Sequence, residues 1–365
     1  MEYEEGSPSS SEETGMDPSS TPSNGSPYAD QQVMSEVHLG CPPHFSGPFI
    51  SHFTFPCPPA LDAEGRTHND VVEGEIEETL ACQMISLDED GDLVLTRRTK
   101  QSNICRMTIQ HSITSSIPSV GLQVWRAELV LADFVVHSMF TSSDFDEIVA
   151  LELGAGTGLL GILLARVAKT VFLTDHGEEV LKNCAANVHL NSQIFKEHQT
   201  SVYVRELDWL KSWPPTVGQD YFPSNERHTW NPPEVEEAEG ASLLLAADVI
   251  YSDDLTDALF DKLQRLMSRG SRKVLYLALE KRYNFSLNDL DVVANGYSRF
   301  QSYLKDEAEC KSLENGKLPC FVGKLIDHTE IPQKQQRRAV FVDALPTISD
   351  PSYLNSSNCM VLTVH

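Results

Sequence analysis

The segment LELGAGTGLLGILLA, residues 151–165, constrains the fold of this chain more than any other stretch. A short apolar run leads into a turn in which glycine occupies every second position, and apolar residues at helical spacing follow. Glycine allows the left-handed backbone of a tight turn and the close approach of another group. The segment therefore predicts a buried strand, a tight turn and a helix, the unit from which open parallel sheets are built.

The same alternation of apolar runs and helical patterns continues along the chain. Strands are predicted at 148–154, 170–175, 201–207, 242–250, 273–280 and 321–327. Helices are predicted at 121–136, 157–168, 178–191, 254–268 and 287–304. Strands that are apolar throughout and alternate with helices favour a sheet covered on both faces. We therefore expect an α/β fold with a doubly wound, mostly parallel sheet.

Composition divides the chain into four regions. Residues 1–30 are rich in Ser, Glu and Pro, which predicts a disordered acidic arm. Residues 31–103 form a poorly defined N-terminal extension, with a short strand expected within 31–60. The regular α/β pattern spans 104–330, where the Pro- and Glu-rich residues 211–241 are expected to form an inserted surface loop. Residues 331–365 form a C-terminal tail outside that pattern.

Charge and cysteine usage exclude several classes of function. The net charge is −25, and residues 1–100 hold 19 acidic against 4 basic side chains, so direct binding of nucleic acid or an anionic membrane is not expected. No apolar run approaches the roughly 20 residues of a membrane span. The eight cysteines include no CxxC pair and the histidines form no HxH cluster, so we expect reduced thiols and no metal.

The glycine turn can be interpreted in two ways, and the first is a dinucleotide site. Gly156, Gly158 and Gly161 match the spacing G-x-G-x-x-G. In that motif the first glycine makes the tight turn directly after the strand. Here it would come two residues late, and Gly161 would fall inside the helix. The dinucleotide interpretation remains an alternative.

The second interpretation is a site for S-adenosylmethionine (SAM), and it begins at the strand end. It places Glu152 before Gly154, Gly156 and Gly158, and a carboxylate there suits a cationic sulfonium and ammonium but would repel a pyrophosphate. Asp175 ends the next predicted strand, where an acid can bind ribose hydroxyls of either cofactor. The residues of the turn favour SAM, whereas Asp175 is compatible with either cofactor.

Three further segments resemble the seven-strand family of SAM-dependent protein-lysine methyltransferases, whose fold is Rossmann-like. They are VGLQVWRAELVLADFV with Trp125, ELDW with Asp208 and Trp209, and AADVIY with Asp248 and Tyr251. The resemblance covers residues 104–330. It implies that Trp125, Asp208, Trp209 and Ala247 lie beside the cofactor. It also implies that Asp248 and Tyr251 are the catalytic pair.

The resemblance implies methyl transfer to a lysine amine, with Asp248 orienting the amine and Tyr251 in the substrate channel. It further implies a nuclear protein substrate that binds nucleic acid, and residence in the nucleus, with the cytoplasm as a second compartment. We expect a monomer. Acids after the DVIY motif and in the insert are expected to form a negative lip that attracts a basic segment: Asp253, Asp254, Asp257, Glu234, Glu236, Glu237 and Glu239.

Other functions and one structural question stay open at this stage. A nicotinamide-dependent oxidoreductase would need a proton donor such as a Tyr-x-x-x-Lys set, which is missing, and a non-catalytic methyltransferase-like module would differ by not binding SAM. The NPPE at 231–234 lacks the aromatic residue that a nucleic-acid methyltransferase uses for a flipped base. The family closes its sheet with a seventh strand, for which both AVFVDAL at 339–345 and MVLTV at 360–364 are candidates.

Overall fold

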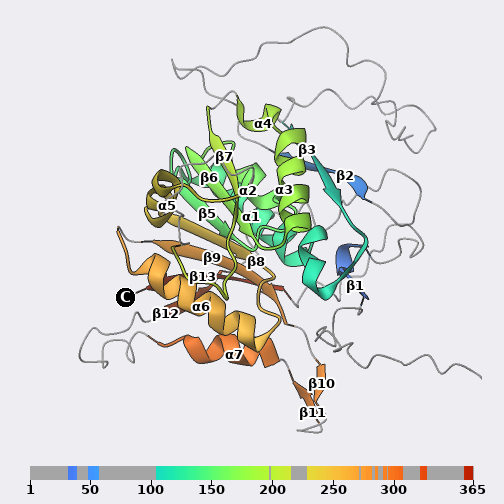
Figure 1. The fold of residues 1–365 in the computed structure, drawn as a ribbon, viewed down its shortest axis with the longest axis vertical. Helices are drawn as coiled ribbons and strands as arrows, with labels where there is room; N and C mark the ends of the chain where they lie inside the picture. Colours follow the sequence, from blue (N-terminus) through green and yellow to red (C-terminus); the bar gives the residue numbers. More distant parts are fainter. Residues whose placement is uncertain are drawn as a thin grey trace, which may run out of the picture.

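A seven-stranded sheet forms the centre of the computed structural model (Figure 1). The structure describes residues 32–38, 48–56, 104–196, 199–214, 228–270, 273–281, 284–286, 291–293, 295–306, 321–326 and 357–364. The strand order is β12-β13-β9-β8-β5-β6-β7. The strands are β5 (Val149–Leu153), β6 (Thr170–Asp175), β7 (Ser201–Glu206), β8 (Leu243–Ala247), β9 (Val274–Glu280), β12 (Phe321–Leu325) and β13 (Ser357–Val364).

Strands β5 to β9 are parallel, and the sheet order reverses between β5 and β8. From β5 the chain moves outward through β6 and β7 and then returns to β8 on the other side of β5. Ligands of open α/β sheets bind beyond the carboxyl ends of the strands at such a reversal. The topology therefore places the expected site after β5 and β8, and it confirms the predicted doubly wound sheet.

Alternate residues of each central strand enter two separate cores. Ala150 and Val171 face one core, which contains residues of α1 (Arg126–Thr141), α2 (Leu159–Leu164) and α3 (Glu178–Leu190). Leu151 and Phe172 face the other, which contains residues of α5 (Pro232–Glu239) and α6 (Asp253–Met267) together with Phe300 of α7 (Asn295–Tyr303). Because both faces are covered, the strands are apolar at every position, which is why they were recognisable in the sequence.

The seventh strand is β13, which contains the MVLTV run. It lies between β12 and β9 and is antiparallel to both, with Met360 opposite Leu277 and Val361 opposite Lys324. The other candidate, at 339–345, lies outside the described residues. The C-terminal tail thus completes the sheet.

Part of the N-terminal extension packs against the sheet domain. β2 (Phe49–Pro56) pairs with β3 (Ile104–His111), and β1 (Gln32–Met34) pairs with β4 (Thr114–Ser116). The buried side chain of Gln123 accepts from the Ser35 N–H at 2.7 Å and donates to the Val33 carbonyl at 3.1 Å. These contacts hold the start of the described chain against η2 (Ile117–Leu122), the segment before α1.

Two asparagines of α3 and Asn191, the residue directly after it, bind the free edge of β3. Asn187 Oδ1 accepts from the Gln110 N–H at 2.7 Å, and its Nδ2 donates to the Gln110 carbonyl at 2.9 Å. Asn191 makes the same pair of bonds with Thr108, and Asn183 adds a bond to the Gln110 carbonyl. These side chains, four residues apart on one helix face, satisfy backbone groups that an edge strand would otherwise leave unpaired.

The structure differs from the predicted elements in the insert and after β9. Part of the expected loop at 211–241 is the eight-residue helix α5, which begins at a capping box: Asn231 Oδ1 accepts from the Glu234 N–H at 2.9 Å. The NPPE sequence is thus a helix start. The predicted helix at 287–304 is shorter, because β10 (Asn284–Ser286) and β11 (Asp291–Val293) precede α7 as a small hairpin that projects from the body in Figure 1.

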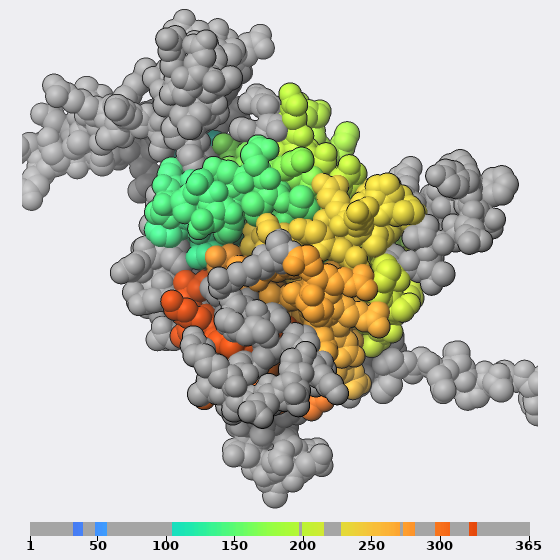
Figure 2. Space-filling model, turned by 90° about the vertical axis from the view of Figure 1, so that its left-hand side faces the viewer, coloured from blue at the N-terminus to red at the C-terminus, as the bar shows by residue number. Residues whose placement is uncertain are grey.

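Segments far apart in the sequence form a continuous surface. In Figure 2 the green residues from the first half of the domain border yellow and orange residues from the second half. α1 contacts β9 and β13 on the same side of the sheet, which explains this contact between the two halves. Among the described helices, none has the length and apolar character that a membrane crossing requires.

Candidate functional site

The glycine turn after β5 has the left-handed backbone that its sequence predicts. Gly154, Gly156 and Gly158 have φ of 69°, 51° and 80°. A Cβ on Gly156 would lie 3.0 Å from the carbonyl oxygen of Gly121 in η2, and one on Gly154 would lie 2.7 Å from Val249 Cγ1. The turn therefore packs closely between the segment before α1 and the segment after β8, with no room for side chains.

A pocket opens beyond the carboxyl ends of β5, β6 and β8, beside this turn. All but one of the residues singled out in the sequence line it: Trp125, Glu152, Gly154, Gly156, Asp175, Asp208, Trp209, Ala247, Asp248 and Tyr251. Gly158 is the exception. A Cβ there would lie 2.8 Å from the buried Cys184 sulfur. Gly158 therefore faces the protein interior and contributes to the turn without lining the pocket.

Several lining residues were not predicted from the sequence. They are Pro118, Val120, Gly121, Gln123, Glu128, Ala155, His176, Val180, Leu207, Leu210, Val249 and Leu255. Five of them are adjacent in sequence to a predicted residue, so their positions follow once the motif is placed: Ala155, His176, Leu207, Leu210 and Val249. Glu128 is three residues after Trp125 and therefore projects from the same face of α1. That spacing was a usable signal for Glu128.

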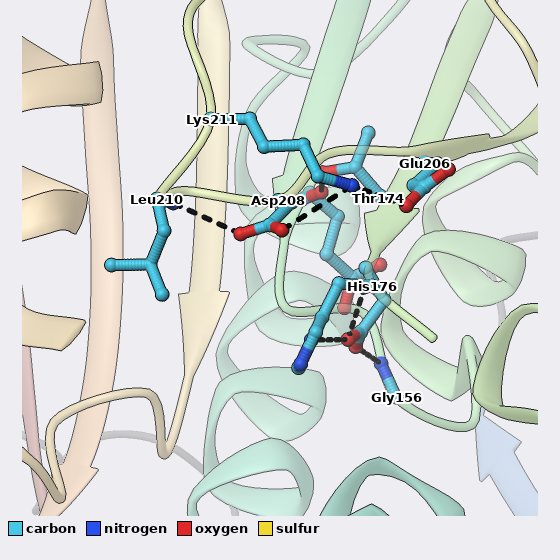
Figure 3. A network of polar contacts seen from close by, with 9 residues as sticks. Gly156, Thr174, His176, Glu206, Asp208, Leu210 and Lys211 are labelled. Carbon is cyan, nitrogen blue, oxygen red and sulfur yellow. Dashed lines mark hydrogen bonds and ion pairs between the residues drawn. The ribbon is translucent and has the colours of Figure 1, made fainter. Parts of the chain in front are cut away.

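Asp175 connects the glycine turn to the end of β6 (Figure 3). Its Oδ2 accepts from the Gly156 N–H at 2.8 Å, and its Oδ1 accepts from the His176 N–H at 2.7 Å. The same carboxylate raises the pKa of the neighbouring His176 imidazole, with which it makes a 3.5 Å contact. Asp175 thus fixes the turn geometry while one side of its carboxylate faces the pocket.

Asp208 lies in a short turn after β7 (Figure 3), and Trp209 follows it in the sequence. Asp208 Oδ1 accepts from the Leu210 N–H at 3.0 Å, and its Oδ2 lies 3.5 Å from Lys211 Nζ. Glu206, 3.4 Å from the same ammonium, and Asp208 together raise the Lys211 pKa. The turn directs the indole of Trp209 toward the glycine turn, within 3.6 Å of where a Gly154 Cβ would lie.

Three buried carboxyl groups lie at the inner end of the pocket. Glu128, Glu152 and Asp248 are 6%, 2% and 8% exposed. Burial raises the Glu128 pKa to about 8, although the Thr157 hydroxyl donates to its Oε1 at 3.1 Å. Burial and the Glu128 charge raise the Glu152 pKa well above its usual range. Glu152 Oε2 has no hydrogen-bond partner among the described residues. This end of the pocket is thus suited to a positive charge.

Asp248 and Tyr251 follow β8 on the opposite wall. Asp248 has a φ of 56°, unusual for a residue with a side chain, and its N–H donates to the Ala278 carbonyl at 2.8 Å. Tyr251 is 39% exposed. Burial of its hydroxyl and the nearby carboxylates of Asp175 and Asp248 raise its pKa to about 12, so the phenol stays neutral at pH 7. Strained backbone of this kind is often found at functional sites.

The prediction that the acids of the insert line the mouth of this pocket is wrong. None of them is among the lining residues, and three have partners on neighbouring elements. These pairs are Glu234 with Arg205 at 2.5 Å, Glu237 with Thr170 at 2.7 Å and Glu239 with Arg269 at 2.8 Å. Thr170 is the first residue of β6, so α5 runs toward the edge of the sheet opposite the pocket.

The acids after the DVIY motif differ in pairing and exposure. Asp257 is bound by the guanidinium of Arg299 at 2.5 Å and by the Tyr303 hydroxyl at 2.7 Å, so its charge is balanced within the α6–α7 contact. Asp253 and Asp254 are exposed in the first turn of α6, next to Leu255 of the pocket lining. Only these two acids of the expected lip lie exposed close to the pocket.

The residues present fit SAM. The turn brings backbone close to the pocket, Asp175 presents a carboxylate at the end of β6, and the buried acids Glu128 and Glu152 line the same pocket and suit a cationic group. A pyrophosphate would meet these carboxylates instead of hydrogen-bond donors, which argues against the dinucleotide alternative. In the part of the chain that the structure describes, no group of His, Cys, Asp and Glu residues could hold a metal ion.

Comparisons with known proteins agree with this geometry. Residues 103–221 match the family model described as lysine methyltransferase. The chain is 34% identical over 306 residues to methyltransferase-like protein 22 of Mus musculus, covering 73% of this chain and 74% of the relative. It is 32% identical over 164 residues to the protein N-lysine methyltransferase METTL21A of Danio rerio, covering 45% and 62%.

Among solved structures, the magnesium protoporphyrin IX methyltransferase of Synechocystis with bound S-adenosylhomocysteine matches 65% of this chain and 83% of its own, with 13% identity and a TM-score of 0.33. The sequence match to the mouse relative spans most of both proteins. Together with the sheet order and the SAM-compatible pocket, it shows that this chain belongs to the SAM-dependent protein-lysine methyltransferase family that includes methyltransferase-like protein 22.

Proposed function

We propose that this enzyme methylates a lysine within a Lys- and Arg-rich segment of a nuclear protein that binds nucleic acid. The observation that carries the proposal is the arrangement of the pocket, which Asp248 lines and beside which the acids Asp253 and Asp254 are exposed. The enzyme is a protein-lysine methyltransferase, and the proposal concerns its substrate.

Different residues of the pocket would bind different parts of SAM. When bound, SAM supplies an activated methyl group on a sulfonium, so the protein needs no strong acid or base. The glycine turn and Asp175 would hold the cofactor's ribose side, and Glu152 its positively charged end. Trp125 and Trp209 cover the pocket from α1 and from the turn after β7 and limit the access of water.

Asp248 and Tyr251 would position the lysine amine. The amine must be neutral to act as a nucleophile, and its reference pKa is about 10.4. Burial beside the Tyr251 ring lowers that pKa, whereas a carboxylate at Asp248 raises it. Asp248 is therefore suited to orienting the amine by accepting its hydrogen bonds. The Tyr251 phenol, neutral at pH 7, offers a second polar contact near the mouth.

The basic character of the substrate is inferred from charge. The protein has a net charge of −25, and Asp253 and Asp254 stand exposed beside the pocket. A negative mouth raises the encounter rate of a positively charged segment. Nuclear proteins that bind nucleic acid contain many such segments, and we propose them as the substrate class.

Labelled-methyl transfer to an array of lysine-containing peptides tests the proposal. Each basic peptide is paired with one whose basic residues, other than the target lysine, are replaced by glutamine. We expect transfer mainly to the basic member, and none when the target lysine is replaced by arginine. Equal transfer to both members, or transfer only to acidic peptides, would refute the proposed substrate class, while calorimetry would report SAM binding independently.

We propose that the protein is located in the nucleus and acts as a monomer. The local basic run KQQRR at 334–338 supports nuclear import, although it lies outside the described residues. Microscopy of the tagged full chain and of a variant with Lys334, Arg337 and Arg338 changed to alanine tests the location. Exclusion of the unmodified chain from the nucleus would refute it. Light scattering after size-exclusion chromatography gives the oligomeric state, and a dimeric mass would refute the second point.

A further inference from the structure

Glu128 is a buried acid of the cofactor pocket to which the function described so far gives no role. It lies in the first turn of α1, three residues after Trp125, and its side chain lines the pocket although only 6% of the residue is exposed. A charged side chain in such a position costs free energy unless it is paired or protonated. Glu128 therefore needs an explanation.

Its hydrogen bonds connect α1 to the turn that holds the cofactor. The Thr157 hydroxyl donates to Glu128 Oε1 at 3.1 Å, and the backbone N–H groups of Trp125 and of Leu159, the first residue of α2, also stabilise the carboxylate. A glutamine could accept two of these three bonds through its carbonyl oxygen. The contacts explain where the side chain lies, and they do not require a charge.

The charges around Glu128 are negative. Glu152 from β5 and Asp248 from the end of β8 repel its ionised form, and Asp175 lies behind Glu152. The Cys184 thiol of α3 faces the same acids, which raise its pKa in addition to burial. The nearest basic side chain on α1, Arg126, lies 3.5 Å from Glu280, and the pocket lining contains no Lys or Arg among the described residues. His176 at the end of β6 also lines the pocket, and its hydrogen bond to the Asp175 carboxylate raises its pKa.

A second buried acid lines the same pocket as Glu128. Glu152 is 2% exposed, its Oε2 has no hydrogen-bond partner among the described residues, and its side chain lines the same pocket. Two acids from different elements thus converge on one space. SAM carries a sulfonium and an ammonium, whereas its product S-adenosylhomocysteine has lost the sulfonium charge and is neutral overall.

We propose that Glu128 loses a proton when SAM binds and that the resulting carboxylate, together with Glu152, makes the pocket prefer the cationic methyl donor to the neutral product. Glu128 is thus a specificity-determining residue for the cofactor. The inference rests on the SAM pocket and is independent of the substrate proposed above.

The expected pH dependence follows from the state of Glu128 in the free protein. Its pKa of about 8 means that it is mostly protonated at pH 7. A nearby cation favours the ionised form and lowers that pKa, so binding releases a proton. SAM affinity should then rise by up to about tenfold per pH unit between pH 6 and 8 and level off above pH 8. The affinity for the neutral product should change much less.

Calorimetric titration of the full chain with SAM and with S-adenosylhomocysteine, between pH 6 and 9, tests this. Repeating the titrations in buffers of different ionisation enthalpy gives the number of protons released. Glu128→Gln keeps the acceptor for Thr157 and removes the charge. Glu237→Gln is the matched control, because it removes a partly buried carboxyl on the opposite edge of the sheet.

We expect Glu128→Gln to release fewer protons and to lower the SAM-to-product affinity ratio by about tenfold or more, since charges about 4 Å apart interact strongly at partly buried sites. Glu237→Gln should keep both properties. Two results would overturn the proposal: unchanged proton release and ratio in Glu128→Gln, or identical pH profiles for SAM and product in the unmodified protein. The comparison of the SAM and product pH profiles uses only the unmodified protein, so it does not require a variant to fold. Both tests measure binding and do not depend on methyl transfer.

Discussion

The most direct test of the cofactor site is a pair of substitutions at Gly156, to alanine and to arginine. Gly156 has a φ of 51°, and a Cβ there would lie 3.0 Å from the Gly121 carbonyl oxygen. The left-handed backbone costs a non-glycine residue about 1–2 kcal/mol, and the close contact adds to this. We therefore expect both variants to lose about 2 kcal/mol of stability, which lowers Tm by roughly 4–8 °C in a domain of this size.

The two variants should differ in SAM binding. The Cβ of residue 156 points to Gly121, which is itself a lining residue, so the longer arginine side chain must enter the pocket. Alanine should weaken SAM by less than about tenfold, or 1.4 kcal/mol, whereas arginine should abolish detectable binding. Thermal unfolding and calorimetry measure the two effects separately. Equal SAM affinity in the two folded variants would refute the placement of the cofactor against this turn.

Three further predictions concern the catalytic wall, the edge of β3 and the mouth. Asp248→Asn, which tolerates the left-handed backbone, should keep SAM affinity within about tenfold and remove methyl transfer; a wild-type rate would make Asp248 structural. Asn187→Ala should lower the free energy of unfolding in denaturant by about 1–3 kcal/mol, because it removes the acceptor of the Gln110 N–H and a donor to the buried Thr157 carbonyl; no change would refute the edge contact. Neutralising Asp253 and Asp254 should flatten the fall of kcat/KM for a basic peptide between 50 and 300 mM salt, where the Debye length shrinks from roughly 14 to 6 Å. Glu236→Gln on α5 should leave this salt dependence unchanged. An equal fall of kcat/KM with salt in both variants would refute electrostatic steering at the mouth of the pocket.

The central strands were predictable because a strand buried on both faces must be apolar at nearly every position. β6 was predicted at the residues it occupies, and β5, β7 and β9 to within one or two residues at either end. The glycine turn was predictable for a similar reason, since a left-handed backbone in close contact with another segment leaves few alternatives to glycine. In both cases a local physical requirement restricts the residue type.

Elements that depend on distant partners were harder to predict. MVLTV in β13 was one of two equal candidates, because its pairing with β9 brings together residues about 80 positions apart with no hairpin turn between them. The helix α5 was hidden in a segment rich in Pro and Glu, although its Asn-Pro-Pro-Glu start has the residues of a capping box. The helix α5 runs away from the pocket and carries its acids with it. Composition alone could not predict that direction.

Glu128 shows why a charged site residue can escape sequence analysis. Within VWRAELVLADFV an isolated glutamate on an amphipathic helix is normally interpreted as solvent-facing. It is buried here because the start of α1 is covered by the glycine turn and by α2, which lie far along the chain. Glu152 was noticed because a motif surrounds it, whereas the only sequence signal for Glu128 is its spacing of three residues from Trp125. The acidic inner end of the pocket is thus built jointly by a recognisable motif and by a residue outside it, and substitutions at the second can alter cofactor preference while the motif stays intact.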